Sequence, residues 1–387
     1  MIETMVKKIK SGRGERYSFG KVEEYCPTPN LLEIQRDAYK KFLETGIDEV
    51  LQEFSPVVDY SGKGKLYFLS SSVEKTPKVS RAECKRRGIS YTTPLKVKAR
   101  FVTDENEAGV EQEVFMGDIP LMTDEASFIF NGIERVVVSQ IVRSPSVYYN
   151  REIDKSGREL ITSQIIPTRG TWLEFETDAR DVLYVRIDRT RKVTLTTLLR
   201  AFGLSSDEDI LKMFGEDEYL KNTIAKDSTK NTDEALIEIY EKLRPGEPAT
   251  LDSSKNQIIT RFFDEFRYDL AKVGRYKFNI KLNVLDRVLN QTLAEDIVVD
   301  GEKKVEKGTV ITKEVLEVLK PIFENGYNVK EVKINEELDA YNKVQTITIY
   351  KPGSKKEKMV LIGNDQTIDS KRLTISDFYA SCSYYFN

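Results

Sequence analysis

The strongest constraint on how this chain folds is an Asn-Gly pair between two runs of strand-forming residues. Asn131-Gly132 separates residues 127–130 from residues 133–141. A type I′ turn needs positive φ at both central residues, and Asn-Gly adopts it most readily, so the pattern predicts a β-hairpin. The three valines at 136–138 are continuous rather than alternating, which is typical of a strand buried on both faces.

The chain after this hairpin changes character, and we place a domain boundary near residues 142–151. Short turns separate three alternating stretches, at residues 160–166, 171–177 and 181–188. Such a meander predicts antiparallel sheet. Helical stripes follow at residues 194–202, 206–214, 233–243 and 254–267. The sequence therefore predicts a multidomain α+β fold with mixed antiparallel sheets and helices, and its 387 residues are enough for two or three domains.

An amphipathic helix is predicted near the N-terminus. It begins after residues 28–30, and Gly46 suits the C′ position at its end. Its apolar positions recur at helical spacing and are Leu31, Ile34, Ala38, Phe42 and Leu43. We expect this stripe to pack in the core.

The stretch 95–101 alternates between apolar and basic residues, as a strand with two different faces does. Its basic positions are Lys96, Lys98 and Arg100. Two interpretations remain open: a solvated sheet face, or a face that lines a nucleic-acid channel. The charges on the neighbouring strands decide between them.

The composition excludes several kinds of chemistry. A net charge of −3 argues against a chain that holds nucleic acid by bulk electrostatics, although local basic faces remain possible contact points. The chain has no histidine, the commonest general base and metal ligand. Three widely spaced cysteines exclude a recognisable zinc motif and fit a reducing compartment; they are Cys26, Cys84 and Cys382. No catalytic or metal-binding set stands out.

The sequence shows no targeting signal, so we expect the protein in the cytoplasm. The basic N-terminus lacks the apolar core of a signal peptide. The chain also lacks an apolar run of about 18 residues, the length that predicts a membrane-spanning helix.

Three motifs resemble one known family. Residues 116–149 read MGDIPLMTDEASFIFNGIERVVVSQIVRSPSVYY, residues 244–248 read RPGEP, and residues 268–279 read YDLAKVGRYKFN. In this order and spacing they resemble the N-terminal protrusion and lobe of the bacterial RNA polymerase beta subunit. Ser146 stands where the family usually has Gly, which questions only the local turn.

The resemblance implies a domain plan. Residues 1–27 would be an N-terminal arm, residues 28–141 the first part of the protrusion, and residues 142–370 the lobe with an α+β insertion at about 291–365. Residues 371–387 would start a helix that returns toward the protrusion. The chain ends within this apolar, aromatic helix, so we expect it to be cut from a longer subunit.

The resemblance also implies a function. Such a segment forms one wall of the DNA channel and contacts promoter and downstream non-template DNA, but is not catalytic alone. The implied partners are the rest of the beta subunit, the beta-prime subunit, the alpha subunits, sigma factor and promoter DNA, in a nucleoid-associated enzyme. No cofactor is expected in this chain; Mg²⁺ would be bound by another subunit.

Arg143 and Trp172 match two residues that line the family's pocket for the non-template strand, where the resemblance implies that the tryptophan stacks on an unpaired base. Arg186, Arg189, Arg191 and Lys192 belong to a segment that resembles the family's basic lobe segment, for which backbone contact with downstream promoter DNA is implied. An indole offers a platform on which an unpaired base stacks, and an arginine meets phosphate or stacks on a base. Trp172 lies on the same strand face as Glu174 and Glu176, which is hard to explain as core, but a core role for this single tryptophan is the alternative. For the basic segment 186–192 the alternative is an exposed charged turn.

Three further residues match the edge of the family's rifamycin pocket: Arg135, Val138 and Gln140. The main wall of that pocket lies beyond this sequence, so we expect no tight drug binding. For Val138 the alternative role is sheet packing.

Two rival functions stay open. An independent single-strand nucleic-acid-binding or adaptor module predicts salt-dependent DNA affinity of the isolated chain. An unrelated enzyme that uses an acidic pair predicts turnover without partners.

Overall fold

The computed structural model describes residues 7–12, 14–18, 29–74, 76–104, 106–155, 157–299, 301–331, 343–354, 358–364 and 370–386. The chain divides into two compact units, residues 1–141 and 142–387. Both combine helices with antiparallel sheets, so the predicted α+β fold class is confirmed. The predicted arm at 1–27 falls partly outside the described residues.

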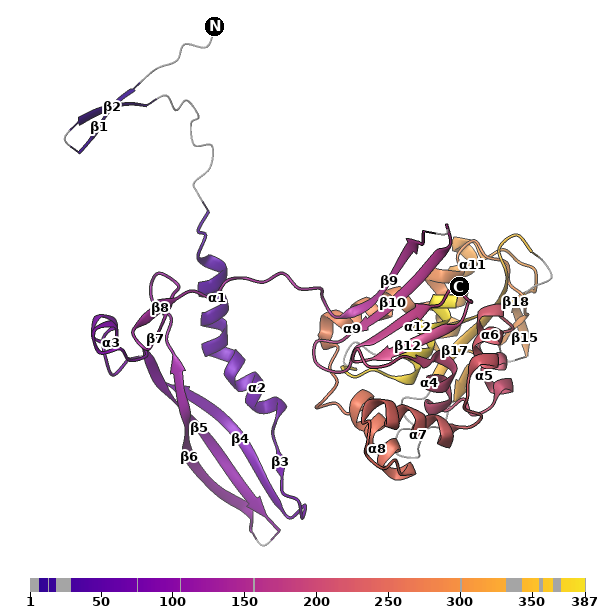
Figure 1. Ribbon diagram of the computed structural model, residues 1–387, viewed down its shortest axis with the longest axis horizontal. Helices are drawn as coiled ribbons and strands as arrows, with labels where there is room; N and C mark the ends of the chain where they lie inside the picture. Colours follow the sequence, from indigo (N-terminus) through magenta and orange to yellow (C-terminus); the bar gives the residue numbers. More distant parts are fainter. Residues whose placement is uncertain are drawn as a thin grey trace. The chain divides into compact units, whose positions relative to one another are not determined.

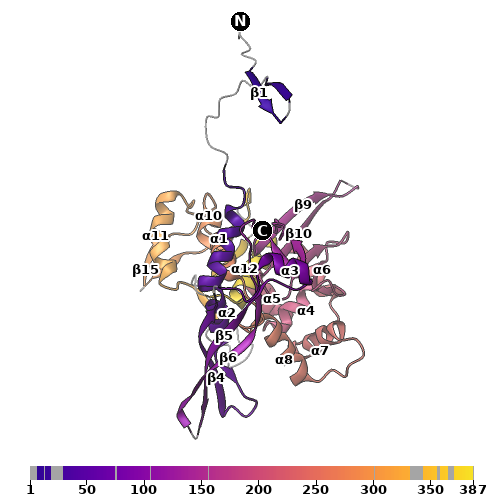
Figure 2. The ribbon, with the colours of Figure 1, turned by 90° about the vertical axis from the view of Figure 1, so that its left-hand side faces the viewer.

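The first unit is built on a sheet of long strands in the order β3-β4-β5-β6 (Figure 1). Helix α2 packs along β4, as both ribbon views show (Figure 2). Its elements are β1 (Lys7–Ser11), β2 (Gly14–Ser18), α1 (Glu33–Lys41), the π-helical turn η1 (Phe42–Gly46), α2 (Ile47–Glu53), β3 (Val57–Val58), β4 (Gly64–Val73), α3 (Arg81–Arg87), β5 (Thr92–Thr103), β6 (Asn106–Pro120), β7 (Phe128–Phe130) and β8 (Ile133–Arg135).

The predicted hairpin is confirmed, but its second strand is shorter than predicted. Strands β7 and β8 pair antiparallel, and Asn131 and Gly132 have φ angles of 50° and 77°, as a type I′ turn requires. Strand β8 ends at Arg135, and residues 136–138 are 60%, 64% and 77% exposed. The predicted burial on both faces is wrong here, because an apolar run becomes a central strand only where strands pair with it.

The N-terminal helix differs from the prediction in its end and in its burial. Helix α1 continues through η1 into α2, and Gly46 has helical φ and ψ angles of −65° and −33°. Leu31 and Ile34 are 77% and 76% exposed. The predicted core packing is therefore wrong for the described part of the chain. Helical spacing identifies an apolar face but does not provide the surface that covers it.

The basic face of β5 is neutralised by neighbouring carboxylates. Lys98 Nζ lies 2.7 Å from a carboxylate oxygen of Glu111 on β6, and Arg100 Nε donates to the other oxygen at 3.0 Å. Lys96 pairs with Glu74 at 3.3 Å. The hydrogen bonds from Lys98 and Arg100 lower the pKa of Glu111 to about 2. These pairs favour a solvated sheet face over a face that lines a nucleic-acid channel.

The second unit begins with a sheet in the order β13-β12-β11-β10-β9, which confirms the predicted meander. Figure 1 shows this sheet with helices and a smaller sheet around it. The elements are β9 (Ser146–Ile153), β10 (Glu159–Ile166), β11 (Leu173–Thr177), β12 (Leu183–Ile187), β13 (Val193–Thr194), α4 (Leu195–Ala201), α5 (Asp207–Phe214), α6 (Glu218–Lys226), α7 (Thr232–Leu243), α8 (Leu251–Phe262), α9 (Ala271–Leu282), α10 (Val284–Val288), β14 (Ile297–Val299), β15 (Glu302–Val305), α11 (Lys313–Glu324), β16 (Val329–Glu331), β17 (Lys343–Tyr350), β18 (Lys358–Gly363) and α12 (Ile375–Phe386).

Helix α12 forms the centre of the second unit. Phe378 is fully buried, and its ring centroid lies 6.0 Å from Phe175 of the sheet and 4.7 Å from Phe202 after α4. Tyr379 is also fully buried and donates its hydroxyl to the Phe202 carbonyl at 2.8 Å. Residues 371–387 were predicted to start a helix that returns toward the protrusion. In the structure α12 packs in the core of the second unit.

The predicted α+β insertion has a small core of its own. Buried side chains of α10, α11, β14, β15, β17 and β18 form a second apolar cluster. This cluster begins at Val284, so the compact region starts several residues before the predicted position of about 291.

Candidate functional site

The five-stranded sheet has one face buried against α12 and one face accessible to solvent. Leu173, Phe175 and Val185 belong to the buried core. Side chains alternate along a strand, so their neighbours Glu174, Glu176 and Arg186 occupy the accessible face. The residues predicted to contact DNA lie near this face or in the turn between β12 and β13; they are Arg143, Trp172, Arg186, Arg189, Arg191 and Lys192.

Trp172 directly precedes β11 and is half-buried. Its backbone N–H donates to Asp188 Oδ1 at 2.9 Å, and its backbone carbonyl accepts from the backbone N–H of Asp188 at 3.0 Å. The Arg189 guanidinium carbon lies 5.7 Å from the centroid of the indole ring, within the range of a cation–π contact. Asp188 thus holds the backbone of Trp172, and the indole, part of which stays accessible, contacts Arg189.

The turn that carries Arg189 has an uncommon backbone. Asp188 and Arg189 have φ angles of 50° and 59°, and Thr190 N–H donates to the Ile187 carbonyl at 3.0 Å. Positive φ is unfavourable for residues with a Cβ and occurs often at functional sites. Arg261 of α8 forms an ion pair with Asp188: its Nη1 lies 3.1 Å from Oδ2, the second carboxylate oxygen. The turn is therefore braced by both Trp172 and α8.

Two of the predicted DNA contacts are already paired with an acid. Arg186 Nε and Lys192 Nζ lie 3.2 Å and 3.1 Å from the two carboxylate oxygens of Glu176. Partial burial acts to raise the pKa of Glu176, but the hydrogen bonds from Arg186 and Lys192 outweigh it and lower that pKa. Lys192 also lies 4.3 Å from the Tyr184 ring centroid. These two cations offer less charge to a phosphate than the sequence suggests.

Arg143 borders the same face from the strand β9 side. Its guanidinium carbon lies 5.4 Å from the Tyr148 ring centroid, and its Nη1 lies 3.5 Å from the side-chain oxygen of Gln164. The amide nitrogen of Gln164 donates to Glu174 at 3.2 Å. Arg191 is exposed.

Sequence reasoning missed several residues that shape this face. Tyr148 and Gln164 alternate with buried residues along β9 and β10, so strand periodicity alone could have placed them there. Asp188 and Arg261 carry no such signal. Their ion pair joins positions 73 residues apart, and only the packing of α8 against the β12–β13 turn brings them together.

The residues predicted for the edge of a rifamycin pocket lie in the other unit. Arg135 is the last residue of β8, and both Arg135 and Gln140 are exposed. Val138 is 77% exposed, which rules out the alternative role in sheet packing for the described part of the chain. The structure does not bring this set into one unit with the six DNA-contact candidates.

The accessible sheet face lies within a region that matches a known family. Residues 143–299 match RNA polymerase Rpb2, domain 2. These residues are a segment of an RNA polymerase beta subunit. The match covers Trp172, Arg189 and the five-stranded sheet, and it places the polymerase segment within DNA-directed RNA polymerase, a multisubunit nucleotidyltransferase.

The described residues of the chain contain neither a metal cluster nor a membrane-spanning helix. No group of three or more Cys, Asp or Glu side chains there is placed to share a metal ion. The expectation that Mg²⁺ is bound by another subunit stays a prediction. Among the same residues, no helix is long and apolar enough to cross a membrane.

Proposed function

We propose that this chain is the protrusion and lobe of a bacterial RNA polymerase beta subunit and that its second unit holds DNA. The observation that carries the proposal is the half-buried Trp172 indole with Arg189 against it, on the accessible face of the sheet. An unpaired base would stack on the indole, and Arg189 would meet the adjacent phosphate.

The electrostatics of the face favour stacking over charge attraction. Glu176 neutralises Arg186 and Lys192, and Glu174 lies on the same face. Together with a net charge of −3, this argues against strong sequence-independent attraction of the DNA backbone. Stacking on an aromatic ring does not depend on such attraction, so it supports contact with single-stranded DNA, which exposes base faces.

Within this proposal the chain forms one wall of the DNA channel and contacts the non-template strand downstream of the active centre. The rest of the beta subunit, the beta-prime and alpha subunits, and sigma factor would complete the enzyme. Arg135, Val138 and Gln140 would form only one edge of a rifamycin pocket. Catalysis and Mg²⁺ binding would belong to other parts of the polymerase.

The test places Trp172→Ala in the complete polymerase and measures open-complex lifetimes on promoters that differ at one unpaired non-template base. Stacking on an aromatic ring contributes roughly 1–3 kcal/mol per base. We therefore expect the lifetime ratio between the preferred and the other bases to fall by about tenfold. Trp172→Phe keeps an aromatic ring and should retain most of the preference.

A matched control separates stacking from stability. Phe266→Ala removes an aromatic ring that is 62% exposed elsewhere in the second unit, and it should leave the base preference unchanged. If Trp172→Ala preserves the base preference and instead lowers the melting temperature of the isolated chain, the indole is a structural residue. The DNA-contact proposal is then wrong, whereas the family assignment stands.

A further inference from the structure

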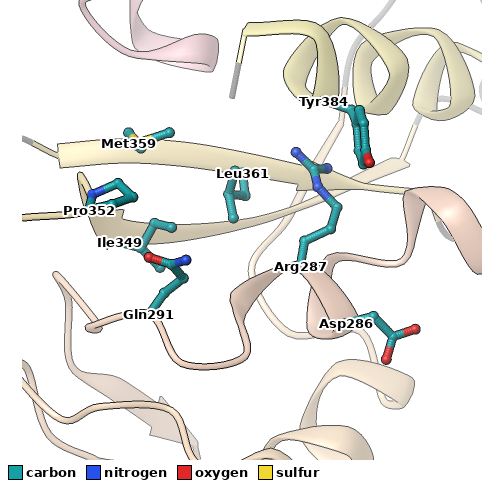
Figure 3. Close-up of a pocket in the computed structure, with 8 residues that line it drawn as sticks. All are labelled: Asp286, Arg287, Gln291, Ile349, Pro352, Met359, Leu361 and Tyr384. Carbon is teal, nitrogen blue, oxygen red and sulfur yellow. The ribbon is translucent and has the colours of Figure 1, made fainter. Parts of the chain in front are cut away.

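A cavity of about 410 Å³ lies between α10, β17, β18 and α12 in the second unit (Figure 3). It is separate from the accessible sheet face, since none of the six DNA-contact candidates lines it. Its apolar wall includes Ile349, Met359 and Leu361, of which Ile349 and Leu361 are buried. A volume of this size is typical of sites for small molecules.

One end of the cavity is formed by a largely buried arginine. Arg287 of α10 donates through Nη1 to the Ile362 carbonyl at 2.8 Å and through Nη2 to Ser383 Oγ at 3.4 Å. Its guanidinium carbon lies 5.0 Å from the ring centroid of Tyr384, as Figure 3 shows for the two side chains. A guanidinium has five N–H donors, so these two bonds leave donors for a further acceptor.

The charge of Arg287 has no counter-ion within the described part of the chain. The titratable neighbours that act on it there are Tyr149 and Tyr384, and no carboxylate is among them. The adjacent Asp286 is exposed, and its carboxylate points away from the guanidinium (Figure 3). Burial lowers the pKa of Arg287 to about 10, which leaves the side chain cationic at neutral pH. A buried charge without an opposite charge is unfavourable, and an anion beside it removes much of that penalty.

We propose that this cavity binds a small organic anion, with its apolar body against Ile349, Met359 and Leu361 and its acidic group on Arg287. The cavity's volume fits a one- or two-ring compound rather than a folded partner. Asp286 is also among the lining residues, and its negative charge disfavours an extended polyanion such as nucleic acid.

The test follows the methyl NMR signal of Met359 in the full chain during titration with naphthalene-1-sulfonate. The neutral analogue 1-naphthalenemethanol has the same rings without the charge. We expect the sulfonate to shift the Met359 signal in a saturable way and to bind about tenfold more tightly than the alcohol, because hydrogen bonds to charged groups are the stronger ones. The signal is assigned with Met359→Leu.

Two variants identify the role of charge. Arg287→Met removes the cation, and the sulfonate should then bind no better than the alcohol. Arg287 also donates hydrogen bonds to Ile362 and Ser383, so its replacement could disturb the local structure. A second variant therefore keeps Arg287: Gln291→Glu adds a negative charge to the cavity wall. It should weaken the sulfonate at least fivefold and leave the alcohol unaffected. Gln112→Glu makes the same change at an exposed site of the first unit and should alter neither affinity.

Several results would overturn the proposal. The cavity is not an anion site if the sulfonate does not shift the Met359 signal. The same holds if the sulfonate binds no more tightly than the alcohol, or if Gln291→Glu leaves the affinity for the sulfonate unchanged. Binding of a short acidic peptide at the Met359 signal without binding of the sulfonate would replace the small molecule by a protein partner. Each of these outcomes leaves the DNA-contact proposal for Trp172 untouched.

Discussion

The two units of this chain are stabilised in different ways. In the first unit the long strands of β4, β5 and β6 pair side by side, yet Phe101, Phe115 and Met116 are 50% to 59% exposed. In the second unit α12 is surrounded by other elements, and both large clusters of buried apolar side chains in the described part of the chain lie there. Backbone pairing dominates the first unit, and side-chain burial dominates the second.

The two units also differ in where their ion pairs lie. The Lys98, Arg100 and Glu111 cluster of the first unit is solvent-exposed. In the second unit Arg275 and Asp377 form a pair at 2.7 Å with both side chains fully buried. Arg275 also donates to two backbone carbonyls, and Asp377 accepts from Thr374, so the buried charges are well satisfied. The buried pair links α9 to α12, whereas the exposed cluster joins neighbouring strands at the surface.

The largest expected effect is the loss of the buried pair. Asp377→Ala leaves the Arg275 charge buried without its partner, and we expect the free energy of unfolding of the second unit to fall by about 3–5 kcal/mol. Urea unfolding followed by the fluorescence of Trp172, the single tryptophan, measures this directly.

The matched change in the first unit is Glu111→Ala, which removes the carboxylate from an exposed ion-pair cluster. It should leave stability almost unchanged, because solvent screens such pairs. Circular dichroism follows its unfolding. Equal losses for Asp377→Ala and Glu111→Ala would contradict the contrast between the units.

The second prediction concerns alkaline pH. Burial raises the pKa of Tyr385 to about 12, and its hydroxyl bonds Thr177 and the Ile161 carbonyl. A raised folded-state pKa gives stability that is complete below the unfolded pKa of about 10 and is lost as pH rises toward the folded value. The second unit should lose about 2 kcal/mol through Tyr385 between pH 10 and pH 12.

Unfolding by urea at several alkaline pH values measures this loss, and Tyr385→Phe should flatten the dependence. Burial also raises the pKa of Tyr149, Tyr268 and Tyr379, so a residual dependence is expected. Tyr60→Phe, at a fully exposed position of the first unit, is the control and should change nothing. A profile that Tyr385→Phe leaves unaltered would refute the assignment.

The smallest expected effect tests the hairpin turn of the first unit. Gly132 has a φ of 77°, and a Cβ there would lie 2.8 Å from the Cα of Gly88. Gly132→Ala should therefore destabilise the β7–β8 hairpin by about 1–2 kcal/mol. Faster hydrogen exchange at the amides of β7 and β8 reports it.

If the two units unfold independently, Gly132→Ala leaves the free energy of unfolding of the second unit, measured by Trp172 fluorescence, unchanged. A parallel loss there would show that the units stabilise each other. Gly246→Ala, at an open position with a φ of 93°, isolates the backbone cost without a steric clash.

Local sequence signals predicted much of the fold. The Asn131-Gly132 turn and the meander of β10, β11 and β12 appeared where periodicity and turn chemistry placed them. Helix α6 was missed, and α8 begins and ends earlier than its apolar stripe suggested. For the candidate site, alternation along β11 separates Glu174 and Glu176 from the buried Leu173 and Phe175, as predicted, because alternation is a local property.

The sequence by itself determined the α+β class, the hairpin turn and, through its motifs, the polymerase family. Tertiary structure alone decided which apolar residues are buried: residues 136–138 are exposed, whereas Phe378 and Tyr379 are enclosed. It also decided which charges are free, since Glu176 meets Arg186 and Lys192, and Asp188 meets Arg261. Turns and periodicity depend on neighbours along the chain, but burial and ion pairing depend on segments that are distant in sequence and meet only in the folded unit.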